Sequence, residues 1–241
     1  MAIHVVPTAR GWPSADPRFG CDNELVSLIG WVRQFLPEGR GAAGGIAKNL
    51  GENEFPDERN IMKNFSEKRS REFHCGRILA RNALLEIGCS PMPILSRKER
   101  DPVWPEGFIG SITHSGEIVV AVSASSNFCR GIGIDVEEND PLDRTLVDMI
   151  CRREEQNVAG LATLGIDHAK LRFVAKEAFY KAVFPLQRRF IDFQEVRIIL
   201  DISSMSFFVE TFFPNEKWCR SSGIGHFTRT PRYLMAYFCC F

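Results

Sequence analysis

The stretch RGIGIDVE, residues 130–137, alternates between apolar residues and small or acidic ones. This period of two is typical of a β-strand and puts Asp135 and Glu137 on one face, with the three β-branched residues on the other. Along a strand the two acidic α-carbons stand about 6.7 Å apart, so both carboxylates can converge on one hard cation. The two glycines on the same face leave room beside that cation. Taken alone, the segment is equally consistent with an acidic, solvent-facing strand end.

Helix and strand patterns flank this strand on both sides. Ser66 precedes a helical pattern that runs to Gly88, and a second helix is predicted over 169–184, ending at Pro185. The segment 91–105 reads as an irregular crossover. The predicted strands cover 108–112, 117–124, 130–137, 193–200, 206–213 and 232–238.

The order of these elements predicts the fold class. A helix, three strands, a helix and three strands indicate an α+β protein of two similar halves, residues 1–125 and 126–241. Each half is expected to be a helix packed on a small, three-stranded, mainly antiparallel sheet. Residues 38–60 are rich in glycine, asparagine and acidic residues with little periodicity, which predicts a mobile loop.

Opposite charges balance along the chain. Among 241 residues, 30 Lys and Arg oppose 30 Asp and Glu, which disfavours a uniform field for nucleic acid or membranes. The longest apolar runs, such as 118–122, are far shorter than a membrane span, and no signal peptide is evident. We therefore expect a cytoplasmic protein without a transmembrane segment. The eight cysteines form no Cys-x-x-Cys pair and are expected to be reduced.

The second predicted helix combines a carboxylate with lysines. Glu177 and Lys181 lie four residues apart and therefore share a face. An exposed pair at this spacing stabilises a helix and needs no further role. Lys176 beside them favours a second interpretation, in which lysines hold phosphate oxygens while Glu177 completes a magnesium shell.

The first predicted helix is strongly cationic, with six basic against two acidic side chains between residues 63 and 81. Its Arg69, Arg77 and Arg81 fall within one sector of a helical wheel and can serve one groove. Arginine forks suit a terminal phosphate, although a solvated face is an alternative. Nucleic-acid binding is disfavoured because the patch is short and residues 135–154 carry seven acidic against three basic side chains.

Residues 110–116, GSITHSG, end a predicted strand with a hydroxyl and an imidazole, Thr113 and His114, before a glycine turn. A lone histidine is more often structural or exposed than functional. No Gly-x-Ser-x-Gly motif occurs here, so we do not expect the chain to supply its own nucleophile.

Four stretches together resemble the 4′-phosphopantetheinyl transferases, and more closely their siderophore-synthesis subgroup, the enterobactin synthetase component D type. The stretches are 68–88 (KRSREFHCGRILARNALLEIG), 101–115 (DPVWPEGFIGSITHS), 131–137 (GIGIDVE) and 173–185 (FVAKEAFYKAVFP). GIGIDVE followed by FVAKEAFYKA is a specific combination. The resemblance spans about residues 60–195, while residues 1–60 match nothing in the family and the region near 40–55 resembles an insertion.

The resemblance implies an enzyme that transfers the phosphopantetheine arm of coenzyme A to a serine of an apo carrier protein, and releases adenosine 3′,5′-bisphosphate. It implies magnesium held by Asp135, Glu137 and Glu177. Glu177 is the expected base for the carrier serine, with Glu137 as the second choice. The diphosphate is assigned to Lys176 and Lys181.

The same resemblance assigns the 3′-phosphate end of coenzyme A to Arg69, Arg77 and His114. Weaker candidates for this end are Arg81, Arg100 and Thr113. Family members often carry a lysine near Ser96, where this chain offers Arg97 and Lys98 as adjacent substitutes.

The family fold implies two similar α+β halves in one chain, with the active site in the cleft between them, and we expect a monomer. Acyl, aryl and peptidyl carrier domains are all possible acceptors, and the sequence does not distinguish among them. The alternative function is a binding module, a non-catalytic coenzyme A-binding subunit of a synthetase assembly.

Overall fold

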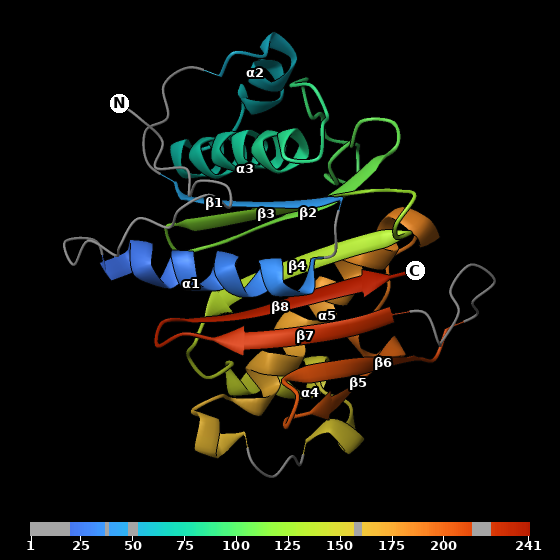
Figure 1. Cartoon of the computed structure of the whole chain (residues 1–241). Helices are drawn as coiled ribbons and strands as arrows, with labels where there is room; N and C mark the ends of the chain where they lie inside the picture. The colour runs from blue at the N-terminus through green and yellow to red at the C-terminus, as the bar shows by residue number, and fades with distance from the viewer. Residues whose placement is uncertain (1–19, 37–38, 48–52, 157–160, 214–222) are drawn as a thin grey trace. The chain divides into compact units, whose positions relative to one another are not determined.

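The predicted α+β class is confirmed, because helices pack on two separate antiparallel sheets (Figure 1). The computed structural model describes residues 20–36, 39–47, 53–156, 161–213 and 223–241. The chain divides into two units, Met1–Phe128 and Cys129–Phe241. Of the loop predicted over residues 38–60, residues 38 and 48–52 lie outside the described ranges, and residues 56–60 belong to a helix, so the loop prediction is wrong there.

Unit 1 contains a three-stranded antiparallel sheet in the order β1-β3-β2. Its strands are β1 (Arg40–Ile46), β2 (Phe108–Ser115) and β3 (Ile118–Ser125), and its helices are α1 (Gly20–Phe35), α2 (Pro56–Met62) and α3 (Glu67–Leu85). The main helix of this unit is α3, and it covers one face of the sheet while α1 covers the other (Figure 1). The predicted sheet of this half is therefore right in size but wrong in one of its strands.

Residues 40–46 form that unexpected strand, so the prediction of a loop there is wrong. The strand lacks an alternating pattern because helices cover both of its faces and only small residues fit. A Cβ atom on Gly41 would lie 2.0 Å from the carbonyl oxygen of Ala83 in α3. A Cβ atom on Gly44 would lie 2.7 Å from Cδ1 of Ile29 in α1. The glycines on which the loop prediction was based therefore allow α1 and α3 to pack closely on this strand.

Helix α3 follows the sequence prediction at both ends. The Ser66 side chain accepts a hydrogen bond from the backbone N–H of Arg69 at 3.3 Å, which caps the helix start. After the helix, Gly88 takes φ +84°, a left-handed conformation that glycine adopts without strain. Buried residues such as Leu79 and Ala83 fix one face of α3 on the sheet.

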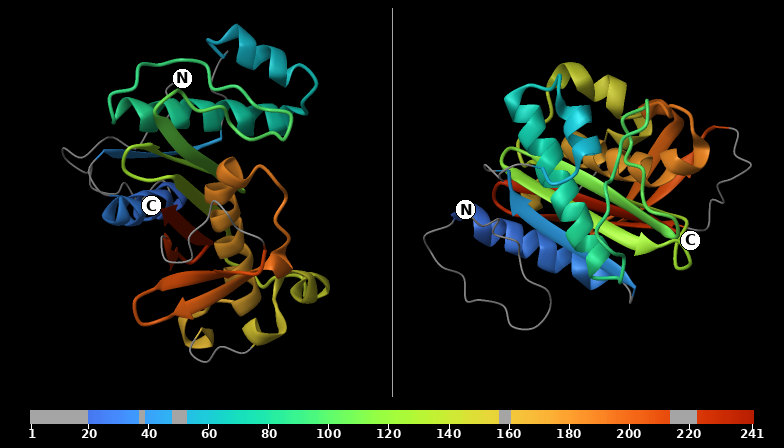
Figure 2. Two further views of the ribbon diagram at one scale, coloured as in Figure 1. Left: turned by 90° about the vertical axis from the view of Figure 1, so that its right-hand side faces the viewer. Right: turned by 90° about the horizontal axis from the view of Figure 1, so that it is seen from above.

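Unit 2 is built on a five-stranded antiparallel sheet in the order β4-β8-β7-β6-β5, rather than the predicted three. The strands are β4 (Gly131–Glu138), β5 (Val196–Asp201), β6 (Ser206–Thr211), β7 (Gly223–Arg229) and β8 (Tyr233–Cys240). The helices are α4 (Arg144–Ile150) and α5 (His168–Gln187), with short 3-10 turns at Arg153–Glu155, Ala162–Leu164 and Phe193–Glu195. Figure 2 shows α5 against one face of this sheet.

Two strands explain the difference in sheet size. β4, which we counted with the first three strands, pairs instead with β8, and Asp135 stands opposite Ala236. β7 was not predicted at all. A Cβ atom on its Gly225 would lie 2.1 Å from the ring of Phe207, so the glycine makes room for a buried aromatic side chain. The residues around Gly225 do not indicate that Phe207 packs there, so the strand could not be predicted from the local sequence.

Helix α5 packs directly on β4 through the two glycines of the GIGIDVE motif. A Cβ atom on Gly133 would lie 1.9 Å from the carbonyl oxygen of Ala178, and one on Gly131 would lie 2.2 Å from that of Ala182. The expectation that these glycines leave room for a cation is therefore wrong, since the helix backbone fills that space.

Helix α5 also continues past Pro185, where we predicted its end. The chain leaves the helix only at Arg188, which takes a left-handed conformation and donates its backbone N–H to the carbonyl oxygen of Phe184 at 2.8 Å. Proline lacks one N–H, but one missing hydrogen bond near a helix end does not stop the final turn.

The described cysteines are consistent with a reduced protein. Six cysteines are buried and form no disulfide within the described part of the chain, namely Cys75, Cys89, Cys129, Cys151, Cys239 and Cys240. In the described part of the chain, no helix is both long enough and apolar enough to cross a bilayer.

Candidate functional site

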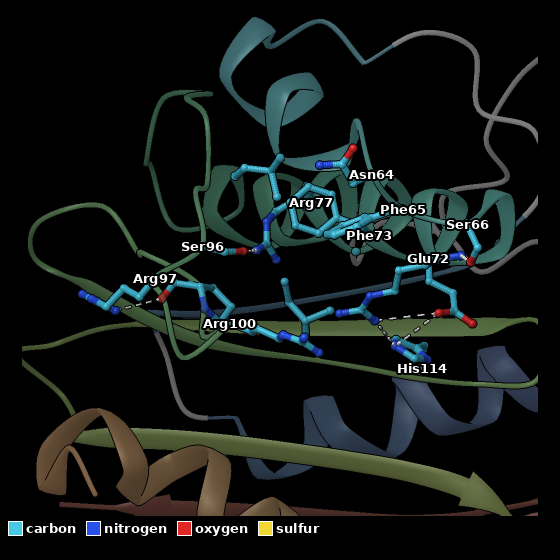
Figure 3. A pocket seen from close by; sticks show the side chains of 15 residues that line it. Asn64, Phe65, Ser66, Glu72, Phe73, Arg77, Ser96, Arg97, Arg100 and His114 are labelled. Carbon is cyan, nitrogen blue, oxygen red and sulfur yellow. Dashed lines mark hydrogen bonds and ion pairs between the residues drawn. The ribbon is translucent and has the colours of Figure 1, made fainter.

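Unit 1 has a pocket of about 590 Å³ above one face of α3 (Figure 3). The helix contributes positions three, four, seven and eight residues after Arg69, which share one side of a helix. The lining residues from α3 are Arg69, Glu72, Phe73, Gly76 and Arg77. Strand β2 adds Ile112 and His114, and the crossover adds Ser96, Arg97, Arg100 and Pro102. Of the sequence-predicted residues, the pocket thus gathers Arg69, Arg77, Arg100 and His114.

Arg69 and His114 meet at one side of the pocket. Nη1 of Arg69 lies 3.3 Å from Nε2 of His114 and 3.8 Å from a carboxylate oxygen of Glu72. Glu72 also lies 3.8 Å from His114 (Figure 3). Glu72 was missed from sequence, although its position three residues after Arg69 was the signal that could have found it.

Arg77 is buried and fixed by the crossover. Its Nε donates to the carbonyl oxygen of Ile94 at 2.6 Å, and its Nη2 donates to Oγ of Ser96 at 2.8 Å. The guanidinium also lies 4.3 Å from the ring centre of Phe73. Burial lowers the pKa of Arg77 to about 10, so the side chain still carries its charge at neutral pH. The pocket therefore holds a fixed positive charge.

Two predicted residues are absent from the lining of this pocket. Arg81 lies one turn beyond Arg77, and its Nη1 donates to Oε1 of Glu58 at 2.6 Å, an ion pair with a carboxylate that is fully buried. Thr113 is buried and alternates with Ile112 and His114 along β2, so it belongs to the other face of that strand. The helical period placed Arg81 close to the side of α3 that carries Arg69 and Arg77, but it could not reveal the ion pair with Glu58.

The crossover supplies two arginines close to Ser96, where the resemblance predicts a basic side chain. Arg97 pairs with Asp101 through Nη1 and Oδ2 at 2.7 Å, and Arg100 lines the pocket beside it. Ser96 is held by Arg77, whereas Lys98 is exposed and is not among the lining residues. Figure 3 shows Ser96, Arg97 and Arg100 grouped on the same side of the pocket.

In unit 2, the predicted carboxylates Asp135, Glu137 and Glu177 influence one another through the charge of Asp135. Burial, together with the charge of Asp135, raises the pKa of Glu137 to about 6. The same two causes, in the same order, raise the pKa of Glu177 above its usual range. Because Asp135 acts on both, the β4 carboxylates and the α5 carboxylate share one charged neighbourhood.

The two predicted lysines of α5 have different environments. Nζ of Lys181 pairs with Oδ1 of Asp135 at 2.6 Å, and its side chain is 28% exposed. Nζ of Lys176 is buried and donates to the carbonyl oxygens of Ile150 and Phe193 at 2.7 and 2.9 Å and to Glu155 at 2.8 Å. An ammonium group has three donors, so Lys176 has none left for a phosphate. In this structure its role is to hold α5 in place.

The three carboxylates have suitable donor chemistry for a divalent cation, but the structure does not arrange them as a formed metal site. Among the described residues, no group of three His, Cys, Asp or Glu side chains is arranged to hold a metal ion. Carboxylate oxygens are the ligands that Mg²⁺ prefers, and burial together with the charge of Asp135 disfavours the ionised forms of Glu137 and Glu177, which a bound cation would favour. Asp135, Glu137 and Glu177 are therefore the residues of unit 2 with suitable donor chemistry.

A second, smaller pocket of about 150 Å³ adjoins Glu177 in unit 2. Its walls are mainly apolar, and sequence analysis identified only Lys176 and Glu177 among them. The lining residues are Lys176, Glu177, Phe179, Tyr180, Phe190, Ile191, Asp192, Phe193 and Val196.

Two family models match the chain in separate segments. Residues 57–124 match the 4′-phosphopantetheinyl transferase N-terminal domain, and residues 131–238 match the 4′-phosphopantetheinyl transferase superfamily. The first segment contains the arginine-lined face of α3, and the second contains Asp135, Glu137 and Glu177.

Individual relatives agree with these models. The chain is 34% identical over 150 residues to the 4′-phosphopantetheinyl transferase PptT of Mycobacterium tuberculosis, covering 62% of this chain and 66% of that protein. It is 34% identical over 151 residues to Npt of Nocardia iowensis, covering 63% and 68%. It is also 34% identical over 137 residues to enterobactin synthase component D of Escherichia coli, covering 55% and 64%. The chain thus spans about two thirds of the length of these relatives, and it belongs to the 4′-phosphopantetheinyl transferase superfamily.

Proposed function

We propose that this chain transfers the 4′-phosphopantetheine group of coenzyme A to a serine of an apo carrier domain and releases adenosine 3′,5′-bisphosphate. The observation that carries this proposal is the shared neighbourhood of Asp135, Glu137 and Glu177, in which burial and then the charge of Asp135 raise the pKa of both glutamates. Such a cluster suits phosphoryl transfer, where charge neutralisation and positioning supply most of the rate.

The chemical step is a displacement at phosphorus. The carrier serine Oγ forms a bond to the phosphorus that bears the pantetheine, and the bond from that phosphorus to the bridging oxygen breaks. The adenosine 3′,5′-bisphosphate leaves with the bridging electron pair. We assign Glu177 to accept the serine proton, with Glu137 as the second candidate, because their raised pKa values bring both closer to neutral pH.

The basic residues bind the substrate in this proposal. The pocket of unit 1, with Arg69, Arg77 and His114, is assigned to the phosphate monoester of coenzyme A, because arginine forks match phosphate oxygens. Lys181 is assigned to the diphosphate, since it is partly exposed beside Asp135. Lys176 is not assigned a substrate contact.

Magnesium is part of the proposal as the ion held by Asp135, Glu137 and Glu177. When bound, it would neutralise the diphosphate and the charge that develops on the leaving group. The support is the donor chemistry of the three carboxylates, and the fact that burial and then the charge of Asp135 raise the pKa values of Glu137 and Glu177, whose ionised forms a cation would favour.

The test is an intact-mass measurement on an apo carrier protein incubated with coenzyme A and Mg²⁺. We expect a gain of about 340 Da, the size of the phosphopantetheine group. Glu177→Gln and Glu137→Gln should abolish or greatly slow the gain, and chelation of the metal should do the same. Glu138→Gln is the matched control, because Glu138 is the exposed neighbour of Glu137 on β4. Binding of coenzyme A without any mass gain, across several carriers, would favour the non-catalytic alternative and contradict the proposal.

A further inference from the structure

Lys181 has the position of a counter-ion in the carboxylate cluster of unit 2. Its Nζ lies 2.6 Å from Oδ1 of Asp135, whose side chain is only 7% exposed. Burial and then the charge of Asp135 raise the pKa of Glu177, and the charge of Lys181 opposes that rise. At Glu137 the same two causes raise the pKa, and the charges of Lys170 and then Lys181 oppose them. One ammonium group therefore acts on all three carboxylates, as a bound cation would.

The backbone of α5 is fixed at this point, whereas the Lys181 side chain can move. At Gly131 and Gly133 the helix lies directly on β4, because the carbonyl oxygens of Ala178 and Ala182 occupy the space of a Cβ atom. Lys181 lies between these two contacts in the sequence. Its side chain is 28% exposed and has a flexible four-carbon stem. Lys181 can therefore exchange one anionic partner for another by side-chain rotation, without displacement of the helix.

A divalent cation and the Lys181 ammonium group compete for the same carboxylate. Like charges a few ångströms apart repel each other strongly in a partly buried site. The three carboxylates form no group that is arranged to hold a metal ion, as far as the structure describes the chain. The ion pair gives a physical reason for this, because Lys181 already neutralises Asp135.

We propose that Lys181 is an internal counter-ion of the cluster, which leaves Asp135 when a divalent cation binds and then donates to the diphosphate of coenzyme A. Binding of the cation and binding of the substrate are thus coupled through one side chain. This inference rests on the proposed function, because it takes the cation and the diphosphate from it. A lysine that always contacts the diphosphate would instead contribute to coenzyme A affinity both with and without the cation.

The experiment measures the dissociation constant of coenzyme A by titration calorimetry, once with saturating Mg²⁺ and once with EDTA, and without a carrier protein. The variants are Lys181→Met and, as the matched control, Lys170→Met. Nζ of Lys170 pairs with Oδ1 of Asp140 at 2.7 Å, and the Asp140 side chain is 64% exposed and lies outside the cluster. The control therefore removes an equal charge near Glu137 and leaves the ion pair at Asp135 in place.

The two conditions should give different results for Lys181→Met. With Mg²⁺, the variant should bind coenzyme A roughly tenfold more weakly, which corresponds to one lost charge-assisted hydrogen bond. With EDTA, its loss should not exceed that of Lys170→Met, about threefold or less, because Lys181 is then engaged by Asp135 in the wild type.

The affinity for Mg²⁺ in the absence of coenzyme A provides a second signature. Lys181→Met should bind Mg²⁺ about fivefold to tenfold more tightly than the wild type, because the ion pair no longer competes, whereas Lys170→Met should gain less than about threefold. Lys181→Arg keeps the charge and should return the affinity to within about twofold of the wild type. A variant that merely loosened the fold would bind both ligands more weakly. If Lys181→Met does not fold, Lys181→Gln takes its place in both measurements.

An equal loss of coenzyme A affinity in Lys181→Met with and without Mg²⁺ would overturn the inference, and so would equal gains in Mg²⁺ affinity in the two lysine variants. Either result leaves the proposed function intact. A wild-type protein that binds coenzyme A but no Mg²⁺ would instead contradict the magnesium site of the proposed function, and the inference with it.

Discussion

Replacement of Gly133 by alanine should displace α5 from β4 and disable the carboxylate cluster. The added Cβ would stand 1.9 Å from the carbonyl oxygen of Ala178 and 2.7 Å from the backbone nitrogen of Ala182. Both atoms belong to the α5 backbone, so no side-chain rotation relieves the clash. An ordinary C···O separation of about 3.3 Å requires α5 to move by about 1.4 Å.

The magnitude follows from that displacement. Overpacking of a buried site usually costs about 1–3 kcal/mol, and we expect about 3 kcal/mol of unfolding free energy because a helix backbone must move. Helix α5 carries Glu177 and Lys181, and a misplacement of about 1 Å can slow a reaction by about 10²-fold. The folded fraction of Gly133→Ala should therefore transfer phosphopantetheine about a hundredfold more slowly.

The assay combines urea denaturation with the initial rate of carrier modification, corrected for the folded fraction. Gly165→Ala is a control in the same unit, because Gly165 has φ +62° and the guanidinium end of Arg229 is its nearest neighbour within 4 Å. This control should lose about 1–2 kcal/mol to left-handed strain and keep its rate. A Gly133→Ala protein with wild-type stability, or with an undiminished rate, would refute the reasoning.

Lys176→Met removes the closer of two cations beside the buried Glu155, leaves Arg172 at 3.8 Å from that carboxylate, and should cost about 3 kcal/mol by urea denaturation. Lys181→Met should cost less and slow transfer more, because Lys181 is partly exposed beside Asp135. The reverse order would contradict their assigned roles. Glu58→Leu should lower the free energy of unfolding by about 3–5 kcal/mol, because it leaves the buried Arg81 without its carboxylate partner. The double variant Glu58→Leu/Arg81→Leu should recover part of that loss. If the losses of the two single variants simply add in the double variant, the buried ion pair does not contribute as described. Magnesium affinity, measured by calorimetry, should fall as the pH is lowered through about 6, because burial and a neighbouring aspartate raise the pKa of Glu137 to about 6 and protons then compete with the cation. Constant affinity from pH 7.5 to 5 would exclude Glu137 as a ligand.

Local patterns were sufficient where one face of an element is buried and the other is not. Helix α3 begins at the Ser66 cap and presents Arg69 and Arg77 to one pocket, as the helical spacing predicts. The period of two in β4 placed Asp135 and Glu137 on the same face, and the pKa of Glu137 agrees with that, because it is raised by burial and then by the charge of Asp135. In each case the relevant information lies within a few residues.

Elsewhere the same local evidence was misleading. Strand β1 is made of small residues because α1 and α3 approach it from both faces, so its sequence looks like a loop. The charges of Arg81 and Lys176 suggested ligand binding, yet the buried carboxylates of Glu58 and Glu155 take both of them. Each partner lies about 20 residues away or more, at a spacing that no helix or strand period connects.

The sequence by itself determined the family motifs, the α+β class, the faces of the main helices and the identity of the acidic and basic groups available for chemistry. The period of a helix or strand is a property of the local backbone, so it assigns each side chain to a face. Only the tertiary structure decided which charges remain for a ligand, because a buried charge is stable only with a partner and that partner comes from another part of the chain. For this reason Arg100 lines the unit 1 pocket and Lys181 stays partly exposed beside Asp135, while Arg81 and Lys176 are held by buried carboxylates within the protein.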